Sequence, residues 1–349
     1  MNSQFKINNF DLLRILAASQ VVFSHTLWHL RIARPAWWAV IEAFPGVTVF
    51  FVISGFLISA SFERSSSVKS YARNRVLRIY PGLWCCVFAT VVVACAFGYS
   101  FLNWSAPVWL GAQLTGVIYT PEFLRNFGFG SYNGSLWTIP IELQFYCALP
   151  PLYWATRNVE NRTLWIAVAW VCFALIAFTA CLFFAPLSEV QREPTLLKLF
   201  RYSFIPHIYL FLTGVLMQRM RFHDTKWIAG KAPYWIVAYL AVYFLVPYSA
   251  ASYVLETLLL AVVAVSAAYT VPGASHKLLR GNDISYGVYI YHGLLINVFV
   301  ELGLTNRAGY LALLALCAYI AGYLSWIVIE RPFLRSKKHS ITAVYVPAQ

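Results

Sequence analysis

Residues 163–185 read TLWIAVAWVCFALIAFTACLFFA, a run without one charged side chain. An α-helix rises 1.5 Å per residue, so about 20 apolar residues are needed to cross the hydrocarbon of a bilayer. The run therefore predicts a membrane-spanning helix. It also predicts that lipid, rather than water, is the solvent for much of this chain.

Other apolar runs of similar character extend the prediction to about ten transmembrane helices in an all-α integral membrane protein. The expected spans lie near 10–30, 46–62, 82–102, 135–155, 163–185, 203–221, 234–248, 252–271, 284–302 and 309–330. The segment 103–134 is interrupted by Pro107, Pro121 and several glycines. We expect it to be a re-entrant or extracytoplasmic segment, which membrane proteins tolerate where other helices cover it.

The composition agrees with a membrane protein. Of the 349 residues, 60% are hydrophobic and 11% are charged, whereas a soluble domain carries about 25% charged residues. The first apolar stretch contains Arg14 and His25, unlike a cleavable signal peptide, so we expect it to be retained. Because no Walker, Rossmann or zinc motif is present, we expect no bound cofactor and no metal, and we interpret the seven cysteines as packing residues.

The net charge of +13 would suggest a nucleic-acid partner in a soluble protein. Here the positive-inside rule explains it, and we expect no nucleic-acid partner. One set of connections is rich in basic residues, namely Lys6, Arg64, Lys69, Arg73, Arg75, Arg78, Arg157, Arg162, Arg219, Arg221, Lys226, Lys231, Lys277, Arg280, Arg331, Arg335, Lys337 and Lys338. The alternate set holds only Arg31, Arg34, Arg125, Arg192, Lys198, Arg201 and Arg307. The bias predicts that both termini are cytoplasmic, and counting 103–134 as a span would weaken it.

The domain organisation is expected to be simple. Residues 1–335 form one transmembrane domain and 336–349 a short cytoplasmic tail, with no fused soluble domain.

Ionisable residues inside the first span are candidates for function. Arg14 and His25 are nearly three helical turns apart, so they share one face of the helix at a separation of roughly 16 Å. A snorkelling arginine and a satisfied core histidine would explain them without function. Because Asp11 lies beside Arg14, we favour a substrate path along this face.

A basic loop is expected at 71–81, with Arg73, Arg75 and Arg78. An ordinary positive-inside anchor would explain it. Three guanidinium groups can also bind phosphates in a bidentate manner, which favours a cytoplasmic nucleotide such as coenzyme A.

The remaining candidates lie at the ends of other spans. Glu142, two turns into the fourth span, can share a cavity with His25 or form a structural ion pair. Gly46, Ser54 and Gly55 are assigned to close helix packing. Glu330 is as well explained by an ion pair with the cytoplasmic arginines as by catalysis.

Six motifs in this order resemble the acyltransferase-3 family, the multi-spanning enzymes that acylate bacterial surface glycans and some secreted small molecules. The motifs are Asp11 through Arg14 to His25, the run from Pro45 to Leu57, Arg78-Ile79-Tyr80-Pro81, Ser135-Leu136-Trp137-Thr138 with Glu142 and Phe145-Tyr146, Ser285-Tyr286 with Tyr289 and His292, and Glu330 with Pro332. The resemblance covers nearly the whole chain. Ile290-Tyr291 is a mild departure, since the family more often has leucine and an aliphatic residue there.

The resemblance implies a multi-pass O-acyltransferase of the bacterial inner membrane. Its co-substrate would be cytoplasmic acyl-CoA, most often acetyl-CoA, and its acceptor a hydroxyl of a cell-surface or lipid-linked glycan such as O-antigen, capsule or exopolysaccharide. It also implies that His25 is essential and that Arg73, Arg75 or Arg78 binds the phosphates of CoA. Together with the arguments from the residues, we expect catalysis by His25, Glu142 and Asp11, acyl-CoA binding by Arg14, Arg73, Arg75 and Arg78, and support from Ser135, Trp137, Tyr286, His292 and Glu330.

Two mechanisms and two other classes of protein stay open. His25 acts either as a general base on the acceptor hydroxyl, with Glu142 fixing its tautomer, or as a nucleophile that is itself acylated. A proton-coupled transporter would use His25, Glu142 and Arg14 as a relay, but no inverted repeat supports it. A structural or sensing protein would leave the buried histidine and the arginine cluster unexplained. Oligomeric state and acceptor identity are open.

Overall fold

The computed structural model describes residues 8–184 and 195–335, which fall into two compact units. Of the described residues, unit 1 comprises 8–17, 37–65, 140–184 and 195–281. Unit 2 comprises 18–36, 66–139 and 282–335. The expected cytoplasmic tail, 336–349, lies outside the described residues, as do Lys6 and Arg192.

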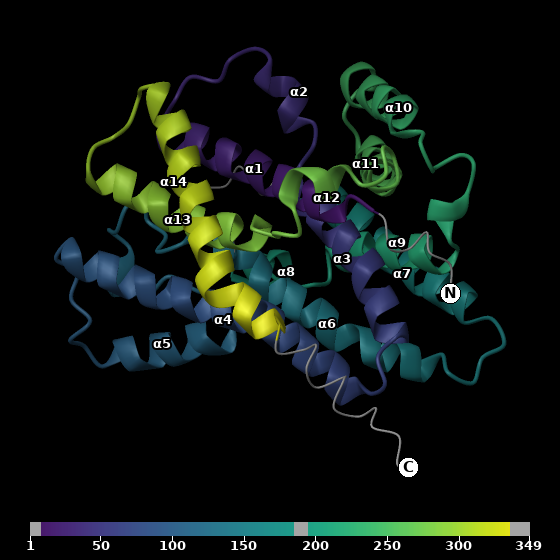
Figure 1. Ribbon diagram of the computed structural model, residues 1–349, viewed down its shortest axis with the longest axis horizontal. Coiled ribbons are helices and arrows are strands. Elements are labelled where there is room, and N and C mark those ends of the chain that lie inside the picture. The colour runs from purple at the N-terminus through teal and green to yellow at the C-terminus, as the bar shows by residue number, and fades with distance from the viewer. Residues whose placement is uncertain (1–7, 185–194, 336–349) are drawn as a thin grey trace. The chain divides into compact units, whose positions relative to one another are not determined.

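The described residues form helices and no strands, which confirms the all-α class (Figure 1). Helix α1 (Phe10–His29) contributes its first part, up to Ala17, to unit 1 and the rest to unit 2. The other helices of unit 1 are α2 (Trp38–Glu42), α3 (Gly46–Glu63), α6 (Thr138–Ala155), α7 (Arg162–Phe184), α8 (Thr195–Arg201), α9 (Ile208–Arg219), α10 (Ala232–Leu245), α11 (Ala250–Ala268) and α12 (Ala274–Leu279). Unit 2 holds α4 (Val68–Ala96), α5 (Ser105–Thr115), α13 (Ser285–Glu301), α14 (Gly309–Ser325), a 3₁₀ turn at Gly134–Trp137 and a π-helical turn at Trp326–Glu330.

Several helices can cross a membrane. Five stretches in the described part of the chain have the necessary length and composition, namely Trp38–Glu63, Val68–Ala96, Arg162–Ala180, Ala250–Ala268 and Gly309–Arg335. Helices α9 and α10 are apolar but shorter. The chain is therefore a multi-pass membrane protein, while the count of ten spans and the orientation of the termini stay predictions.

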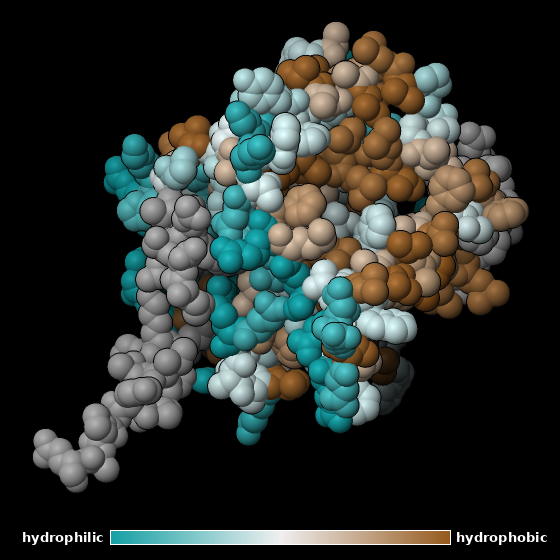
Figure 2. Space-filling model, turned by 90° about the vertical axis from the view of Figure 1, so that its right-hand side faces the viewer, coloured by the Kyte–Doolittle hydropathy of each residue, from teal (hydrophilic) through white to brown (hydrophobic). Residues whose placement is uncertain are grey.

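The outer face of α7 is covered with large apolar side chains. Leu164, Trp165, Leu175 and Phe183 are all more than half exposed. Figure 2 shows a broad hydrophobic area on one face of the molecule. Apolar surface of this extent marks contact with a partner or a membrane, and on a helix of this composition the natural partner is lipid.

The prediction of a basic loop at 71–81 is wrong, because α4 runs through this stretch without a break. The helix begins after Ser67, whose hydroxyl accepts a hydrogen bond from the Ser70 amide at 3.1 Å. Pro81 lies inside the helix. Proline is tolerated in membrane helices where the surrounding helices compensate the lost backbone bond.

The segment 103–134 contains no helix that is long enough to span. Its longest helix is α5, with 11 residues, against the roughly 20 that a crossing requires. This length is compatible with the expected re-entrant or extracytoplasmic course.

In unit 1, helices α3 and α9 pack with their backbones in direct contact. A Cβ atom placed on Gly55 would lie 1.8 Å from the Phe211 carbonyl oxygen, and one on Gly214 would lie 2.0 Å from that of Val52. Each helix thus presents a glycine to a carbonyl of the other. The assignment of Gly55 to helix packing is confirmed.

One end of unit 1 is polar. The Tyr153 hydroxyl donates to the Glu63 carboxylate at 3.0 Å, and Arg219 forms an ion pair with the same carboxylate. Nearby, Ser59 donates to the Gln218 side chain at 2.8 Å. These contacts join the last turns of α3, α6 and α9.

In unit 2, α13 is the central helix and packs against α4 and α14 (Figure 1). Gly287 of α13 faces Gly322 of α14, where an added Cβ would lie 2.8 Å from the Gly322 Cα atom. Small residues thus allow close approach in both units, as is usual in membrane helices.

We predict that Gly55→Ala destabilises the protein. The added methyl group overlaps the Phe211 carbonyl, so α3 and α9 must separate, which costs about 2 kcal/mol or more of unfolding free energy. The measurement is thermal unfolding in detergent micelles, followed by tryptophan fluorescence. Gly111→Ala in α5 is the matched control, because a Cβ there meets nothing within 4 Å. Equal midpoints for the two variants would contradict the packing argument.

Candidate active site

Two histidines from helices distant in sequence meet inside unit 2. The Nδ1 atom of His25, on α1, lies 3.0 Å from the Nε2 atom of His292, on α13, and the ring centroids are 5.1 Å apart. His292 is fully buried, while His25 is partly accessible. The arrangement brings together a residue expected to be catalytic and one expected to support it.

The hydrogen bonds of His292 assign the tautomers of both rings. The Nδ1 atom of His292 lies 2.5 Å from the carbonyl oxygen of Tyr289, which can only accept, so Nδ1 carries the proton. In the neutral ring, Nε2 of His292 is then an acceptor, and Nδ1–H of His25 donates to it. This leaves Nε2 of His25 with a free lone pair, the state that a base or a nucleophile requires.

The turn at Gly134–Trp137 holds α13 in place beside the histidine pair. The Asn133 side chain donates to the Ile290 carbonyl at 2.8 Å and accepts from the Ser135 hydroxyl at 2.5 Å. Gly293, next to His292, allows this close approach, since an added Cβ would lie 2.2 Å from the Asn133 side-chain oxygen. Ser135 therefore positions α13 through Asn133, and Trp137, at the end of the turn, is half-buried.

A second group of contacts lies beyond His25 toward the end of α1. His29 stacks on Phe129 with ring centroids 3.8 Å apart, and its own ring is 5.9 Å from that of His25. Asn297 of α13 donates to the carbonyls of Ser131 and Tyr132, each at 2.8 Å. The segment 128–135 is thus bonded along α13 and also contacts His29 near the end of α1.

At the opposite end of α13, Arg78 joins two carboxylates. Its guanidinium group lies 2.5 Å from Asp283 and 3.7 Å from Glu330, and 5.9 Å from the centre of the Tyr286 ring. Tyr286 in turn donates to the Ile79 carbonyl at 2.8 Å. Glu330 is 2% exposed and ends the π-helical turn of the chain. The ion pair considered for Glu330 is therefore present.

The three arginines of α4 do not lie on one face. Successive helical residues are about 100° apart, so Arg75 and Arg78 are separated by about 60°, whereas Arg73 lies about 160° from Arg75. Arg73 is exposed, and the other two are half-buried. The three arginines are close together in the sequence, but the helix places them on different faces.

The other predicted residues belong to unit 1. Arg14 and Asp11 form an ion pair at 3.9 Å within α1, with Asp11 half-exposed. Glu142, on α6, accepts hydrogen bonds from Tyr146 and, at 3.4 Å, from Ser54. The contact of Glu142 with His25 stays a prediction, because the two residues belong to different units.

Two features escaped the sequence analysis. The direct bond between His292 and His25 joins residues 267 positions apart, and no local pattern predicts it. Glu256 is the only carboxylate of α11, a helix able to cross the membrane. A lone carboxylate in an apolar span is itself a signal of function, so Glu256 could have been identified from the sequence.

Comparisons with known proteins agree with the resemblance. The chain is 30% identical to "Nodulation protein 10" of Rhizobium leguminosarum bv. viciae, over 94% of this chain and 93% of that protein. It is 26% identical to the "O-acetyl transferase" of Shigella phage Sf6, over 94% and 96%. "Acyltransferase MdmB" of Streptomyces mycarofaciens is 26% identical, over 83% and 80%. No solved structure matches. The family model described as an acyltransferase domain, Acyl_transf_3, matches residues 7–331, and the chain therefore belongs to the acyltransferase-3 family.

Proposed function

We propose that this membrane O-acyltransferase transfers an acyl group, most often acetyl, from cytoplasmic acyl-CoA to a hydroxyl of a cell-surface or lipid-linked glycan. The observation that carries the chemical step is the His25–His292 bond, since it leaves Nε2 of His25 unprotonated. The relative named an O-acetyl transferase supports the reaction class.

His25 serves the reaction in either of two ways. As a general base, Nε2 takes the proton of the acceptor hydroxyl while the oxygen attacks the thioester carbon, and the C–S bond breaks to release CoA thiolate, which then takes that proton from Nε2. As a nucleophile, Nε2 attacks the thioester carbon and CoA leaves as a thiolate; the acceptor hydroxyl then attacks the acyl carbon, the bond to Nε2 breaks, and the hydroxyl proton passes to the thiolate. In both schemes His292 stabilises the productive tautomer, a role that the sequence analysis had given to Glu142.

The donor enters from the end of unit 2 that carries Arg73 and Arg75. Tyr286, which contacts Arg78, precedes His292 by six residues, so this end lies about 9 Å from the histidine pair along α13. Because Arg78 is held by Asp283 and Glu330 and the Arg73 side chain is exposed, we assign phosphate binding to Arg73, while Arg75, on another face of α4, stays a predicted contact of the donor. Arg78 then orients α4 relative to α13.

The orientation follows from charge. Arg157, Arg162, Arg219 and Arg221 gather at the end of unit 1 where α3, α6 and α9 finish and α7 begins. The positive-inside rule assigns such an end to the cytoplasm. We place the protein in a bacterial inner membrane with that end inward.

We predict that His25→Ala abolishes acyl transfer without unfolding the protein, because it removes the reacting nitrogen. His292→Ala lowers kcat about 100-fold, because the tautomer of His25 is no longer fixed. The measurement is CoA release from acetyl-CoA by protein in nanodiscs, with a thermal unfolding curve for each variant.

The outcome for Glu142 discriminates between the two orienting groups. If Glu142→Gln abolishes turnover while His292→Ala is nearly as active as the wild type, Glu142 orients His25 and the role given to His292 is wrong. Near-normal turnover of His25→Ala would refute both catalytic schemes.

We predict different effects for the arginines of α4. Arg73→Ala weakens acetyl-CoA binding about tenfold or more, the value of one charge-assisted hydrogen bond, and leaves stability nearly unchanged because the side chain is exposed. Arg78→Ala lowers the free energy of unfolding by about 3 kcal/mol, since it strands two largely buried carboxylates.

The measurements for these variants are isothermal titration with acetyl-CoA and thermal unfolding in detergent. If Arg78→Ala has normal stability but no longer binds acetyl-CoA, then Arg78 binds the donor phosphates and its structural role is wrong.

A further inference from the structure

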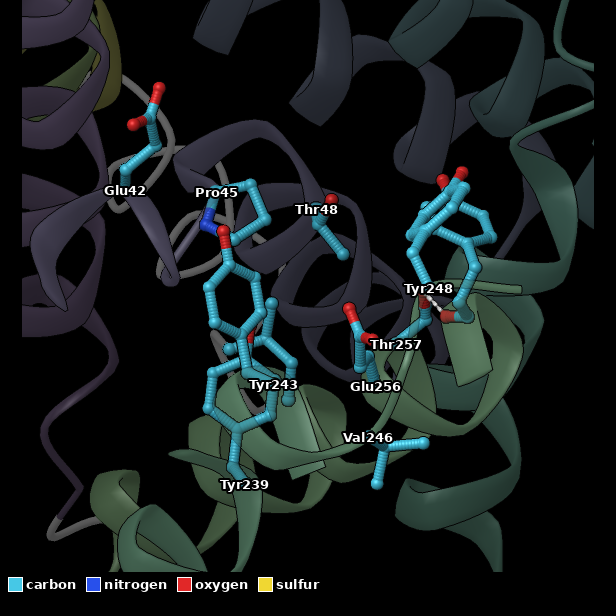
Figure 3. A pocket seen from close by; sticks show the side chains of 11 residues that line it. Glu42, Pro45, Thr48, Tyr239, Tyr243, Val246, Tyr248, Glu256 and Thr257 are labelled. Atoms are coloured by element: carbon cyan, nitrogen blue, oxygen red, sulfur yellow. Dashed lines mark hydrogen bonds between the residues drawn. The ribbon is translucent and has the colours of Figure 1, made fainter. Parts of the chain in front are cut away.

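A cavity of about 460 Å³ opens between α3, α10 and α11 of unit 1 (Figure 3). We call it the tyrosine pocket. Its volume is within the range of about 300–1,000 Å³ that small-molecule sites occupy. Its wall includes Tyr239, Tyr243, Tyr248, Tyr253, Glu42 and Glu256.

Tyrosine rings line the tyrosine pocket on more than one side. The Tyr239 hydroxyl donates to the Ala43 carbonyl, which fixes this buried ring. The centroid of the Tyr243 ring lies 6.1 Å from that of Tyr239. Figure 3 shows Tyr243 and Tyr248 on different sides of the same space. Rigid aromatic faces of this kind pack against apolar C–H surfaces, such as the face of a pyranose ring.

Polar groups with unused bonding capacity line the same space. Among residues 8–184 and 195–335, the Glu256 carboxylate has no hydrogen bond or ion pair, and neither do the hydroxyls of Tyr243 and Thr48. In Figure 3 the Glu256 side chain lies between Tyr243 and Thr257. A carboxylate within an apolar helix is costly in lipid unless it faces water, a partner or a ligand, and Glu256 faces the pocket. Here it can accept hydrogen bonds from hydroxyl groups.

The charge of the tyrosine pocket selects among ligands. Of the described residues that line it, two are glutamates and none is a lysine, arginine or histidine. A phosphate or carboxylate would meet like charge, so the pocket does not suit coenzyme A. A neutral polyol with one apolar face suits both the rings and the carboxylates.

The position of the tyrosine pocket along its helices indicates on which side of the membrane it opens. The tyrosine pocket lies at the Gly46 end of α3 and around the turn that joins α10 to α11. This turn, 246–249, contains no basic residue. The arginine-rich end of unit 1 is at the other end of α3, so charge assigns the pocket to the extracytoplasmic side.

We propose that the tyrosine pocket binds one pyranose ring of the glycan acceptor, with Tyr243 stacking on the ring and Glu256 accepting hydrogen bonds from its hydroxyls. The inference rests on the function proposed above. It adds a binding site for the acceptor in unit 1, at the extracytoplasmic end.

The test is saturation-transfer NMR on the full chain in nanodiscs, with the methyl glycosides of glucose, galactose, mannose, rhamnose and N-acetylglucosamine. We expect at least one glycoside to receive saturation. Its affinity falls tenfold or more in Tyr243→Leu and Glu256→Leu. It is retained in Tyr243→Phe, which keeps the ring, and in Phe244→Leu, a matched change of an exposed residue next to the pocket.

The source of the sugar is tested with the geranyl glycoside of the sugar that binds. Tighter binding than that of the methyl glycoside assigns the ring to a lipid carrier, and equal binding assigns it to a water-soluble glycan. Either result supports the pocket. Binding of choline, but of no glycoside, in a manner that depends on Glu256 would overturn the proposal in favour of a cation site.

Two further outcomes separate this inference from the proposed function. If the wild type releases CoA but binds none of the five glycosides, the sugar-binding role of the tyrosine pocket is wrong and the proposed acyltransferase reaction stands. Glycoside binding that is lost in Glu256→Leu, in a protein that never releases CoA, supports the pocket and overturns the acyl-CoA reaction. Equal binding to all four variants and the wild type places the sugar elsewhere. A thermal unfolding curve for each variant shows whether a loss of binding is caused by misfolding.

Discussion

A hydrogen-bonding group left unpaired in lipid costs several kcal/mol, and this constraint governs the interior of the protein. Polar residues therefore occur in chains of partners. His25 is bonded to His292, and His292 to the backbone of Tyr289. Asn133 satisfies the Ile290 carbonyl, and Asn297 satisfies two carbonyls of the segment it fastens. The network that removes this penalty is the same network that sets the protonation of Nε2 of His25.

The sequence predicted the presence of the helices better than the residues at which they begin and end. Long apolar runs such as 163–185 can only be helical in lipid, so the fold class followed from composition. Charge and proline favour a loop around Arg75 and Pro81, and this prediction is wrong. Charge reports the side of the membrane, however, and not the backbone conformation, so α4 continued where a loop was expected.

The candidate site was only partly accessible to sequence reasoning. His25 and His292 were both named, yet their bond depends on the packing of α1 and α13. The arginines of α4 looked equivalent until helical phase separated exposed Arg73 from Arg78, which is held by two carboxylates. Glu256 could have been identified from the composition of α11 alone, because it is the single carboxylate of that helix. Contacts over long sequence separations were the missing information.

The reciprocal contact of Gly55 and Gly214 limits how the chain can vary in length. One residue inserted before Gly55 in α3 would turn that glycine by about 100° and present a side chain to the Phe211 carbonyl instead. The same holds for α9. Insertions and deletions should therefore be confined to connections such as the one between α10 and α11. That connection borders the tyrosine pocket, so changes in length would alter the rim of the pocket while the helix pair stays in register.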